Sequence, residues 1–168
     1  WPMPHDPNLA WVQIGSQRLP QLNLPPFPLD WRVGGGRTEV KCLSRLKYFA
    51  LEPEEWVRQH WLHHLAHDLN YPAGLMSVEH PLQLNGMKRR ADILCHDRSG
   101  NPLLMVECKR HDVPLSEAVL HQILRYHLAL ETPLIVISNG LKHQAYSFKS
   151  NAFQALDSLP SYDSIPAK

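Results

Sequence analysis

Residues 89–109 read RRADILCHDRSGNPLLMVECK, and this stretch decides the fold. Residues 89–96 and 102–109 predict two strands, which a polar turn at 97–101 joins. The run 103–106 is apolar at every position, which is typical of a strand that is buried on both faces. We therefore expect the second strand to lie in the centre of a sheet.

Three charged residues, Asp92, Glu107 and Lys109, interrupt these two strands. Because strand side chains alternate between faces, Glu107 and Lys109 point to the same side. Charges in apolar surroundings are costly unless they pair or bind a metal. If Asp92 lies beside Glu107, two carboxylates converge, and oxygen ligands of this kind suit Mg²⁺. A structural salt-bridge cluster is the alternative interpretation.

Toward the N-terminus, residues 53–69 predict an amphipathic helix, because apolar residues recur at helical spacing. Pro53, Glu54 and Glu55 are suited to its first turn. Glu54 falls on the apolar face and Glu55 toward the edge of that face. Arg58 follows Glu54 at i, i+4, the spacing of an ion pair that simply stabilises a helix.

The remaining segments complete an α/β pattern. Residues 75–84 predict a strand, and Asn85-Gly86 is a strong hairpin turn signal. Residues 115–131 predict a second helix, and residues 133–138 and 144–148 predict two further strands. The αβββαβ order predicts an α/β fold in which helices flank a mixed β-sheet.

The two ends of the chain are patterned more weakly. Seven of the 15 prolines fall in the first 30 residues, which predicts an extended arm over residues 1–28, with a disordered leader as the alternative. Glycines 34–36 predict a hairpin turn within residues 29–42. The expected division is an arm with a short hairpin, an α/β domain and a tail, at residues 1–42, 43–150 and 151–168.

Composition limits the class of protein. A net charge of +1 over 168 residues gives no global electrostatic case for binding nucleic acid, so any such contact needs local positive charge. Three cysteines without a C-x-x-C spacing argue against a disulfide framework and favour a reducing cytoplasm. No apolar run approaches the roughly 18 residues of a membrane span, so we expect no membrane partner.

Asp92 and Glu107-Cys108-Lys109 resemble the motif of the PD-(D/E)xK nuclease superfamily. Gln122 and Tyr126, four residues apart on the second predicted helix, resemble the Q-x-x-x-Y element of its RecB-like branch. They would otherwise be ordinary core residues of an amphipathic helix.

Residues 43–148 more specifically resemble the N-terminal nuclease domain of type I restriction enzyme R subunits, in a small standalone form. The phrases that carry this resemblance are PEEWVRQH at 53–60, RADI at 90–93, VECK at 106–109 and SNG at 138–140.

The resemblance implies a restriction-endonuclease-like core and an Mg²⁺- or Mn²⁺-dependent endonuclease that acts on DNA. Asp92, Glu107 and the backbone carbonyl of Cys108 would hold the metal. The superfamily also uses a helical acid on the apolar face, so Glu54 is the first candidate to contribute to the metal shell and Glu55 the second. Lys109 would orient or help to deprotonate the attacking water.

The resemblance also implies supporting roles and partners. Gln122 would hold the site and Tyr126 would support it. A basic rim would contact DNA, and its candidates are Lys88, Arg89, Arg90, Arg110 and Arg125. Further partners implied are a second copy of the chain or a motor or specificity subunit.

One feature of the relatives is missing from this sequence. R subunits carry helicase motors, whereas this sequence has no G-x-x-x-x-G-K-[ST] phosphate loop, so ATP-driven translocation is not expected of it. The alternative function is a non-catalytic module with a nuclease fold that binds DNA or docks a partner subunit. The sequence leaves open whether the substrate is DNA or RNA.

Overall fold

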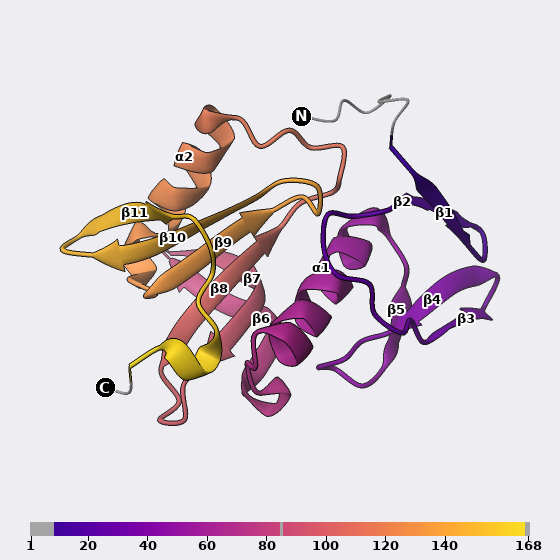
Figure 1. Cartoon of the computed structure of the whole chain (residues 1–168), viewed down its shortest axis with the longest axis horizontal. Coiled ribbons are helices and arrows are strands. Elements are labelled where there is room, and N and C mark those ends of the chain that lie inside the picture. Colours follow the sequence, from indigo (N-terminus) through magenta and orange to yellow (C-terminus); the bar gives the residue numbers. More distant parts are fainter. Residues whose placement is uncertain (1–8, 85, 167–168) are drawn as a thin grey trace.

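The computed structural model describes residues 9–84 and 86–166, and a six-stranded mixed sheet is its largest element (Figure 1). The strand order is β11-β10-β9-β8-β7-β6. Only β8 and β9 pair in parallel, and the other neighbours are antiparallel. The strands are β6 (Met76–Leu84), β7 (Met87–His96), β8 (Pro102–Cys108), β9 (Leu134–Ser138), β10 (His143–Lys149) and β11 (Ala152–Leu156). The predicted α/β class with a mixed sheet is confirmed, and it is consistent with a restriction-endonuclease-like fold.

Two helices accompany the sheet, close to where the sequence predicts them. Helix α1 spans Pro53–His63 and continues as a π-helical turn, η1 (His64–Asp68). Helix α2 spans Glu117–His127, and the 3₁₀ turn η3 (Leu128–Leu130) follows it. The Oγ of Ser116 accepts a hydrogen bond from the Val119 N–H at 3.3 Å and caps α2. Two more 3₁₀ turns are η2 (Ala73–Leu75) and η4 (Tyr162–Ser164).

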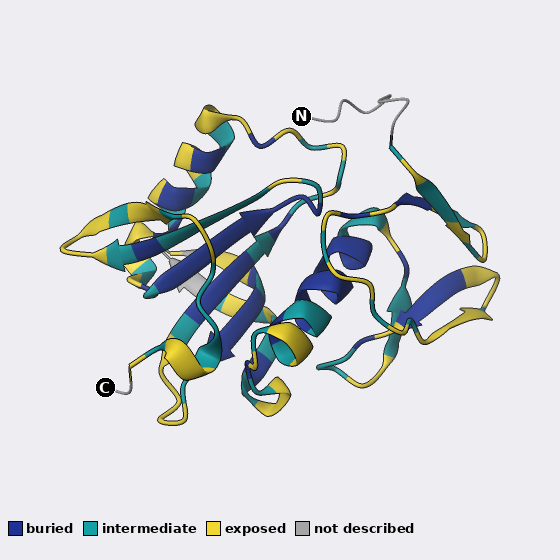
Figure 2. Cartoon of the chain, viewed as in Figure 1, coloured by how far each residue is buried: buried dark blue, intermediate teal, exposed yellow. Residues whose placement is uncertain are grey.

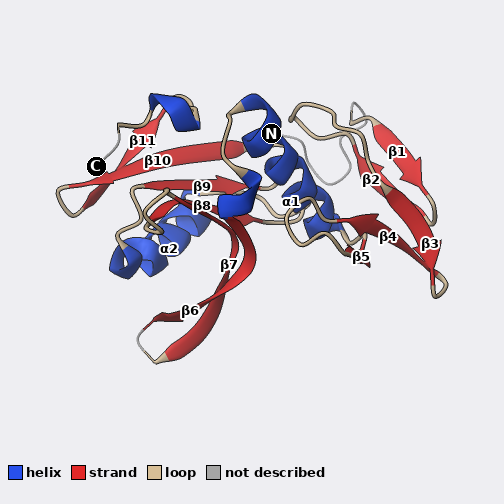
Figure 3. Ribbon diagram, turned by 90° about the horizontal axis from the view of Figure 1, so that it is seen from below, coloured by secondary structure: helices blue, strands red, loops and turns tan. Residues whose placement is uncertain are grey.

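The helices cover opposite faces of the sheet, as Figure 3 shows. Along β9, Leu134 and Val136 belong to the buried cluster that contains the apolar face of α1. The alternate residues Ile135 and Ile137 belong to the cluster of α2. Because alternate strand residues face opposite sides, β9 is buried on both. Each such side chain contributes about 1.5–3 kcal/mol when it is removed from water.

Residues 9–50 contain two small sheets. Strands β1 (Trp11–Ile14) and β2 (Gln17–Pro20) make one hairpin. A three-stranded sheet has the order β3-β4-β5 and consists of Trp31–Gly34, Arg37–Lys41 and Tyr48–Ala50. The hairpin predicted within 29–42 is confirmed, and β1 and β2 form a further hairpin within residues 1–28 that the sequence did not predict. Gly15, at φ +57°, makes the missed turn. Residues 1–8 lie outside the described part.

These N-terminal strands pack on the main core. Leu19 and Leu22 are buried in the same cluster as α1 (Figure 2). The indole N–H of Trp56 donates to the Pro20 carbonyl at 2.8 Å. Gly140, at φ +86°, lies so close to the arm that a Cβ there would be 2.7 Å from a methyl carbon of Leu22. The arm is therefore a structural part of the core.

The C-terminal segment contains one strand that the sequence pattern did not predict. Strand β11 pairs with β10 across a turn in which Ser150 and Asn151 have φ +51° and +59°. Two left-handed residues are what a tight hairpin turn requires. In β11, Phe153 packs on the α2 cluster and Leu156 on the main cluster, and this spacing of three residues does not give the alternation typical of a strand. In the described residues, no helix combines the length and apolar character needed to cross a membrane. Residues 167–168 of the predicted tail are not described.

Candidate active site

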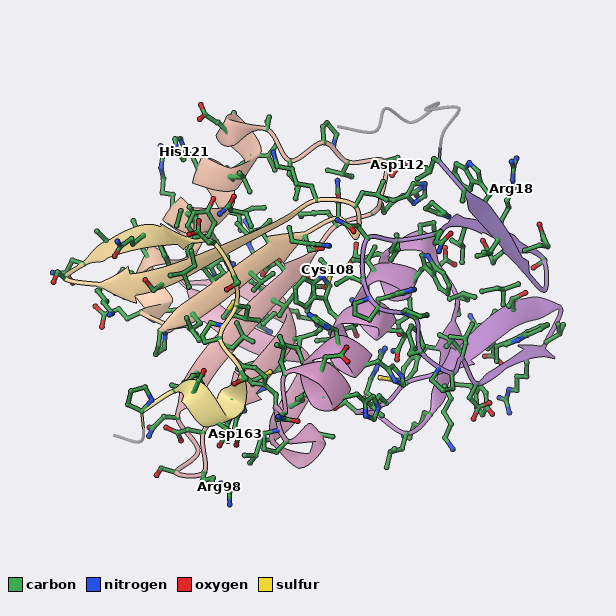
Figure 4. All side chains as sticks on the ribbon, in the orientation of Figure 1. Arg18, Arg98, Cys108, Asp112, His121 and Asp163 are labelled. Carbon is green, nitrogen blue, oxygen red and sulfur yellow. The ribbon has the colours of Figure 1, made fainter. Side chains whose placement is uncertain are left out.

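The candidate site lies where the carboxyl end of β8 meets the first turns of α1. Cys108, labelled in Figure 4, marks this junction. In the β7–β8 pair, Ile93 lies opposite Val106, and the same register places Asp92 opposite Glu107. The backbone pairing stops there, and Asp92 Oδ2 instead accepts the Cys108 N–H at 2.9 Å. Asp92 thereby satisfies a backbone donor at the strand end, and its other oxygen is left for different partners.

A buried arginine, Arg58 of α1, occupies the centre of the acidic cluster. Its Nη2 donates to Asp92 Oδ1 at 3.0 Å and to Glu54 Oε1 at 3.4 Å, and lies 3.7 Å from Glu79 Oε1. Its Nη1 donates to Glu55 Oε2. The side chain of Arg58 is only 7% exposed. One guanidinium therefore joins carboxylates from α1, β6 and β7.

The structure separates the two acids at the start of α1. Glu54 is half-exposed and faces Asp92: partial burial and then the charge of Asp92 raise its pKa to about 7. Glu55 is buried behind it, where Arg45 and Arg58 both donate to its carboxylate. Of the two candidates, Glu54 lies at the site, and Glu55 anchors the arginines.

The raised pKa of Glu54 predicts a pH-dependent effect on the stability of the metal-free protein. Because the folded state binds this proton more tightly than a chain with the ordinary pKa of 4.5, folding stability is lost as the pH rises from that value through about 7. Glu54→Gln removes this loss. We expect the melting temperature of the variant, measured in EDTA, to gain on the wild type between about pH 5 and about pH 8. A difference that stays constant with pH would contradict the prediction.

Glu107 faces the other helix. His127 Nε2 of α2 lies 3.1 Å from Glu107 Oε1, and His127 is 2% exposed. Burial raises the pKa of Glu107, the hydrogen bond from His127 lowers it, and the charge of Asp92 raises it again. The net direction is upward. The two strand acids thus influence each other, and each is held by a cationic or hydrogen-bonding side chain.

Lys109 and Cys108 have different positions at this strand end. The Lys109 N–H donates to the Ser138 carbonyl at 2.8 Å, which fixes its backbone, and its charge lowers the pKa of Glu54. Its side chain is partly exposed. The Cys108 thiol is buried in the core, and burial raises its pKa, so only the backbone of Cys108 is suited to contribute to a site.

Of the two α2 candidates, the structure brings only Tyr126 to this region. The guanidinium of Arg89 lies 4.8 Å from the centre of the Tyr126 ring, and that ring packs edge-on against His127. The Tyr126 hydroxyl is buried and has no hydrogen-bond partner in the described part of the chain. Gln122 is exposed and makes no hydrogen bond to the acidic residues among those described. Its role in holding the site stays a prediction.

The predicted basic rim is divided in space. Lys88, Arg89 and Arg90 are exposed on β7 and, together with Pro81 and Leu82, line a pocket of about 430 Å³. Arg90 also lies 3.6 Å from Glu79, which links this pocket to the acidic cluster. The other two candidates are more dispersed.

Those two are Arg110 and Arg125. Arg110 pairs with Asp112 at 3.1 Å, beside the exit of β8. Arg125 is exposed on α2. The concentrated positive charge near the acids therefore comes from β7.

The candidate ligands fit Mg²⁺ in kind, because all are carboxylate or carbonyl oxygens. Within residues 9–84 and 86–166, however, no three His, Cys, Asp or Glu side chains lie together as a ready metal site. The contacts above give the reason. Asp92 Oδ1 is occupied by Arg58 and Glu107 Oε1 by His127.

Two residues of this cluster, Glu79 and His127, were missed from the sequence. Val78 and His80 pair with Ile93 and Ala91, so Glu79 lies across from Asp92. Residues equally far from Asn85-Gly86 on its two sides face each other in a hairpin, so this turn signal places Glu79 opposite Asp92. Asn85 itself lies outside the described residues. His127 continues the buried α2 positions Leu120 and Leu124, a spacing that could have revealed it.

Comparison with known protein families agrees with this fold. A family model described as the type I restriction enzyme R protein N terminus matches residues 53–160. The matched segment contains Glu54, Asp92, Glu107 and Lys109, and the PD-(D/E)xK assignment is consistent with it. A search of curated proteins found no match. Because the match covers well over half of the 168 residues, the chain belongs to the family of type I restriction enzyme R protein N-terminal domains, a nuclease-related family.

Proposed function

We propose that this protein is a metal-dependent endonuclease that hydrolyses DNA phosphodiester bonds. The observation that carries the proposal is geometric: Arg58 bridges Glu54 and Asp92, and the β7–β8 register places Asp92 opposite Glu107. Three acids gathered where α1 meets β7 and β8 are costly to the fold, which favours a chemical use for them. A bound Mg²⁺ or Mn²⁺ would supply a Lewis acid for the phosphoryl oxygen.

The protein's own residues are arranged for this chemistry. The Cys108 N–H fixes one oxygen of Asp92, and His127 fixes one oxygen of Glu107, so both carboxylates are oriented. Lys109 projects from the same strand end, where its charge can orient water and offset negative charge on a phosphate. Glu54 completes the acidic set from α1.

The pocket lined by Lys88, Arg89 and Arg90 supports binding of a phosphate backbone. Arg90 connects this pocket to Glu79 and so to the acidic cluster. We propose DNA as the substrate on this basis and on family membership. A partner subunit, or a second copy of the chain, would add to this surface.

The proposal is tested by incubating the protein with plasmid, linear and branched DNA in Mg²⁺ or Mn²⁺. We expect cleavage that EDTA abolishes. Lys109→Ala should slow cleavage by roughly 100- to 10,000-fold, the usual contribution of a group that assists proton transfer. Lys149→Ala, which removes an exposed lysine at the β10–β11 turn, serves as the matched control and should cleave like the wild type. DNA binding without cleavage under every condition would contradict the proposal and favour a binding module.

A further inference from the structure

We propose that Arg58 is the internal counter-cation of the acidic site and must leave Asp92 before a divalent cation can bind there. This inference rests on the proposed metal-dependent function. It concerns what the site's own residues do before a metal arrives, and it assigns a positioning role to a residue that the sequence suggested only as a helix-stabilising partner.

The first argument is the position of the guanidinium. Arg58 Nη2 lies 3.0 Å from Asp92 Oδ1, the one Asp92 oxygen that the Cys108 N–H does not hold. The same nitrogen contacts Glu54 at 3.4 Å. A cation that bound Asp92 through Oδ1 would need the oxygen that Arg58 now uses. The two cations therefore compete for this atom.

The second argument is that the two terminal nitrogens of Arg58 have different partners. Its Nη1 is tied to the buried Glu55, which Arg45 also holds. Its Nη2 is divided between Asp92, Glu54 and Glu79. Loss of the Asp92 contact therefore leaves the ion pair with Glu55 intact, and the guanidinium can shift without leaving the cluster.

Glu79 is the acceptor toward which Arg58 can shift. Its Oε1 lies 3.7 Å from Arg58 Nη2, and its side chain is 43% exposed. The backbone of Glu79 has φ +52°, an unfavourable conformation for a residue with a Cβ. This local strain in β6 accompanies a carboxylate that lies beside Arg58 and Arg90.

Charge balance explains why such a device is useful. Without a cation, three carboxylates at one strand end repel one another, and Arg58 offsets that repulsion. With a divalent cation bound, the buried guanidinium of Arg58 would repel it at close range. A metal ion that binds to the wild type must displace Arg58, and the free energy needed for this displacement lowers the apparent metal affinity.

The test is Mn²⁺ binding measured by calorimetry, without DNA, on the full chain. We expect Arg58→Met to bind Mn²⁺ roughly tenfold or more tightly than the wild type, because a competing unit charge a few ångström away is removed. Arg45→Met is the matched control: it also removes an arginine from Glu55 but leaves Asp92 untouched, and its Mn²⁺ affinity should match the wild type. Unchanged or weaker binding by Arg58→Met overturns the inference.

A second readout needs no substitution. In the wild type, the side-chain N–H signals of arginine are followed by NMR during titration with Mg²⁺. We expect the signal of Arg58 to move saturably and that of Arg45 to stay in place. An Arg58 signal that is unmoved at saturating Mg²⁺, or absence of any metal binding, overturns the inference. If metal binding behaves as expected but no DNA is cut, the proposed nuclease function fails while the role of Arg58 stands.

Discussion

Asp92→Asn is expected to lower the rate of DNA cleavage by about 1000-fold or more while the protein stays folded. A metal ion acting as Lewis acid contributes several kcal/mol to the transition state, and each 1.36 kcal/mol corresponds to a factor of about ten. The asparagine amide oxygen can still accept the Cys108 N–H, so the strand end keeps its partner. The substitution removes the negative charge of Asp92, which interacts with both Glu54 and Glu107. Initial rates of plasmid nicking in Mn²⁺ measure the effect, and circular dichroism monitors the fold.

Asp163→Asn is the control for this change. Asp163 is exposed in the C-terminal segment and lies away from Cys108 (Figure 4). The Asp163→Asn substitution also removes one negative charge but leaves the acidic cluster unchanged, so this variant should cleave DNA at the wild-type rate. Cleavage by Asp92→Asn at the wild-type rate would show that this acid has no part in the reaction.

Glu55→Ala is expected to lower the free energy of unfolding by about 3–5 kcal/mol, because removal of one partner leaves buried charges uncompensated. Glu55 is 4% exposed, and both Arg45 and Arg58 depend on it. Glu54→Ala, at the half-exposed neighbouring position, should change the free energy of unfolding by less than about 1 kcal/mol. Urea denaturation of both variants in EDTA provides the comparison.

The alanine variant with the smaller effect on stability, Glu54→Ala, should have the direct effect on catalysis. We expect Glu54→Ala to lose cleavage activity in a protein of nearly normal stability, since Glu54 is the helical acid that faces Asp92. Equal losses of stability in the two variants would remove the distinction between a site acid and an anchor. Activity of Glu55→Ala must be measured below its own melting temperature.

The parts of the fold with strong periodic signals could be predicted from the sequence. The continuous apolar run in β8 predicted a central strand, and the helical spacing after Pro53 predicted α1. The missed strands β1, β2, β5 and β11 are three to five residues long. Strands this short leave no clear alternation, because tertiary packing decides their conformation rather than local preference.

The candidate site was predictable to the extent that it follows strand geometry. Alternation along β8 placed Glu107 and Lys109 on one side, and a plausible pairing placed Asp92 beside Glu107. The role of Arg58 did not follow, because i, i+4 spacing to Glu54 reveals the local pair but not the contact with Asp92, which is 34 residues away along the chain. Long-range ion pairs of this kind depend on how helix and sheet pack.

Leu22 packs against Gly140, and this contact between the N-terminal segment and the core limits how the protein can be divided into fragments. The family match begins at residue 53, whereas the buried cluster around α1 also takes Leu19, Leu22, Val40 and Cys42 from earlier in the chain. A fragment trimmed to the matched residues would expose apolar surface on α1 that those four side chains now cover. The family match and the packed core therefore have different limits: the matched segment carries the acids, and the preceding segment contributes four buried side chains to the core around α1.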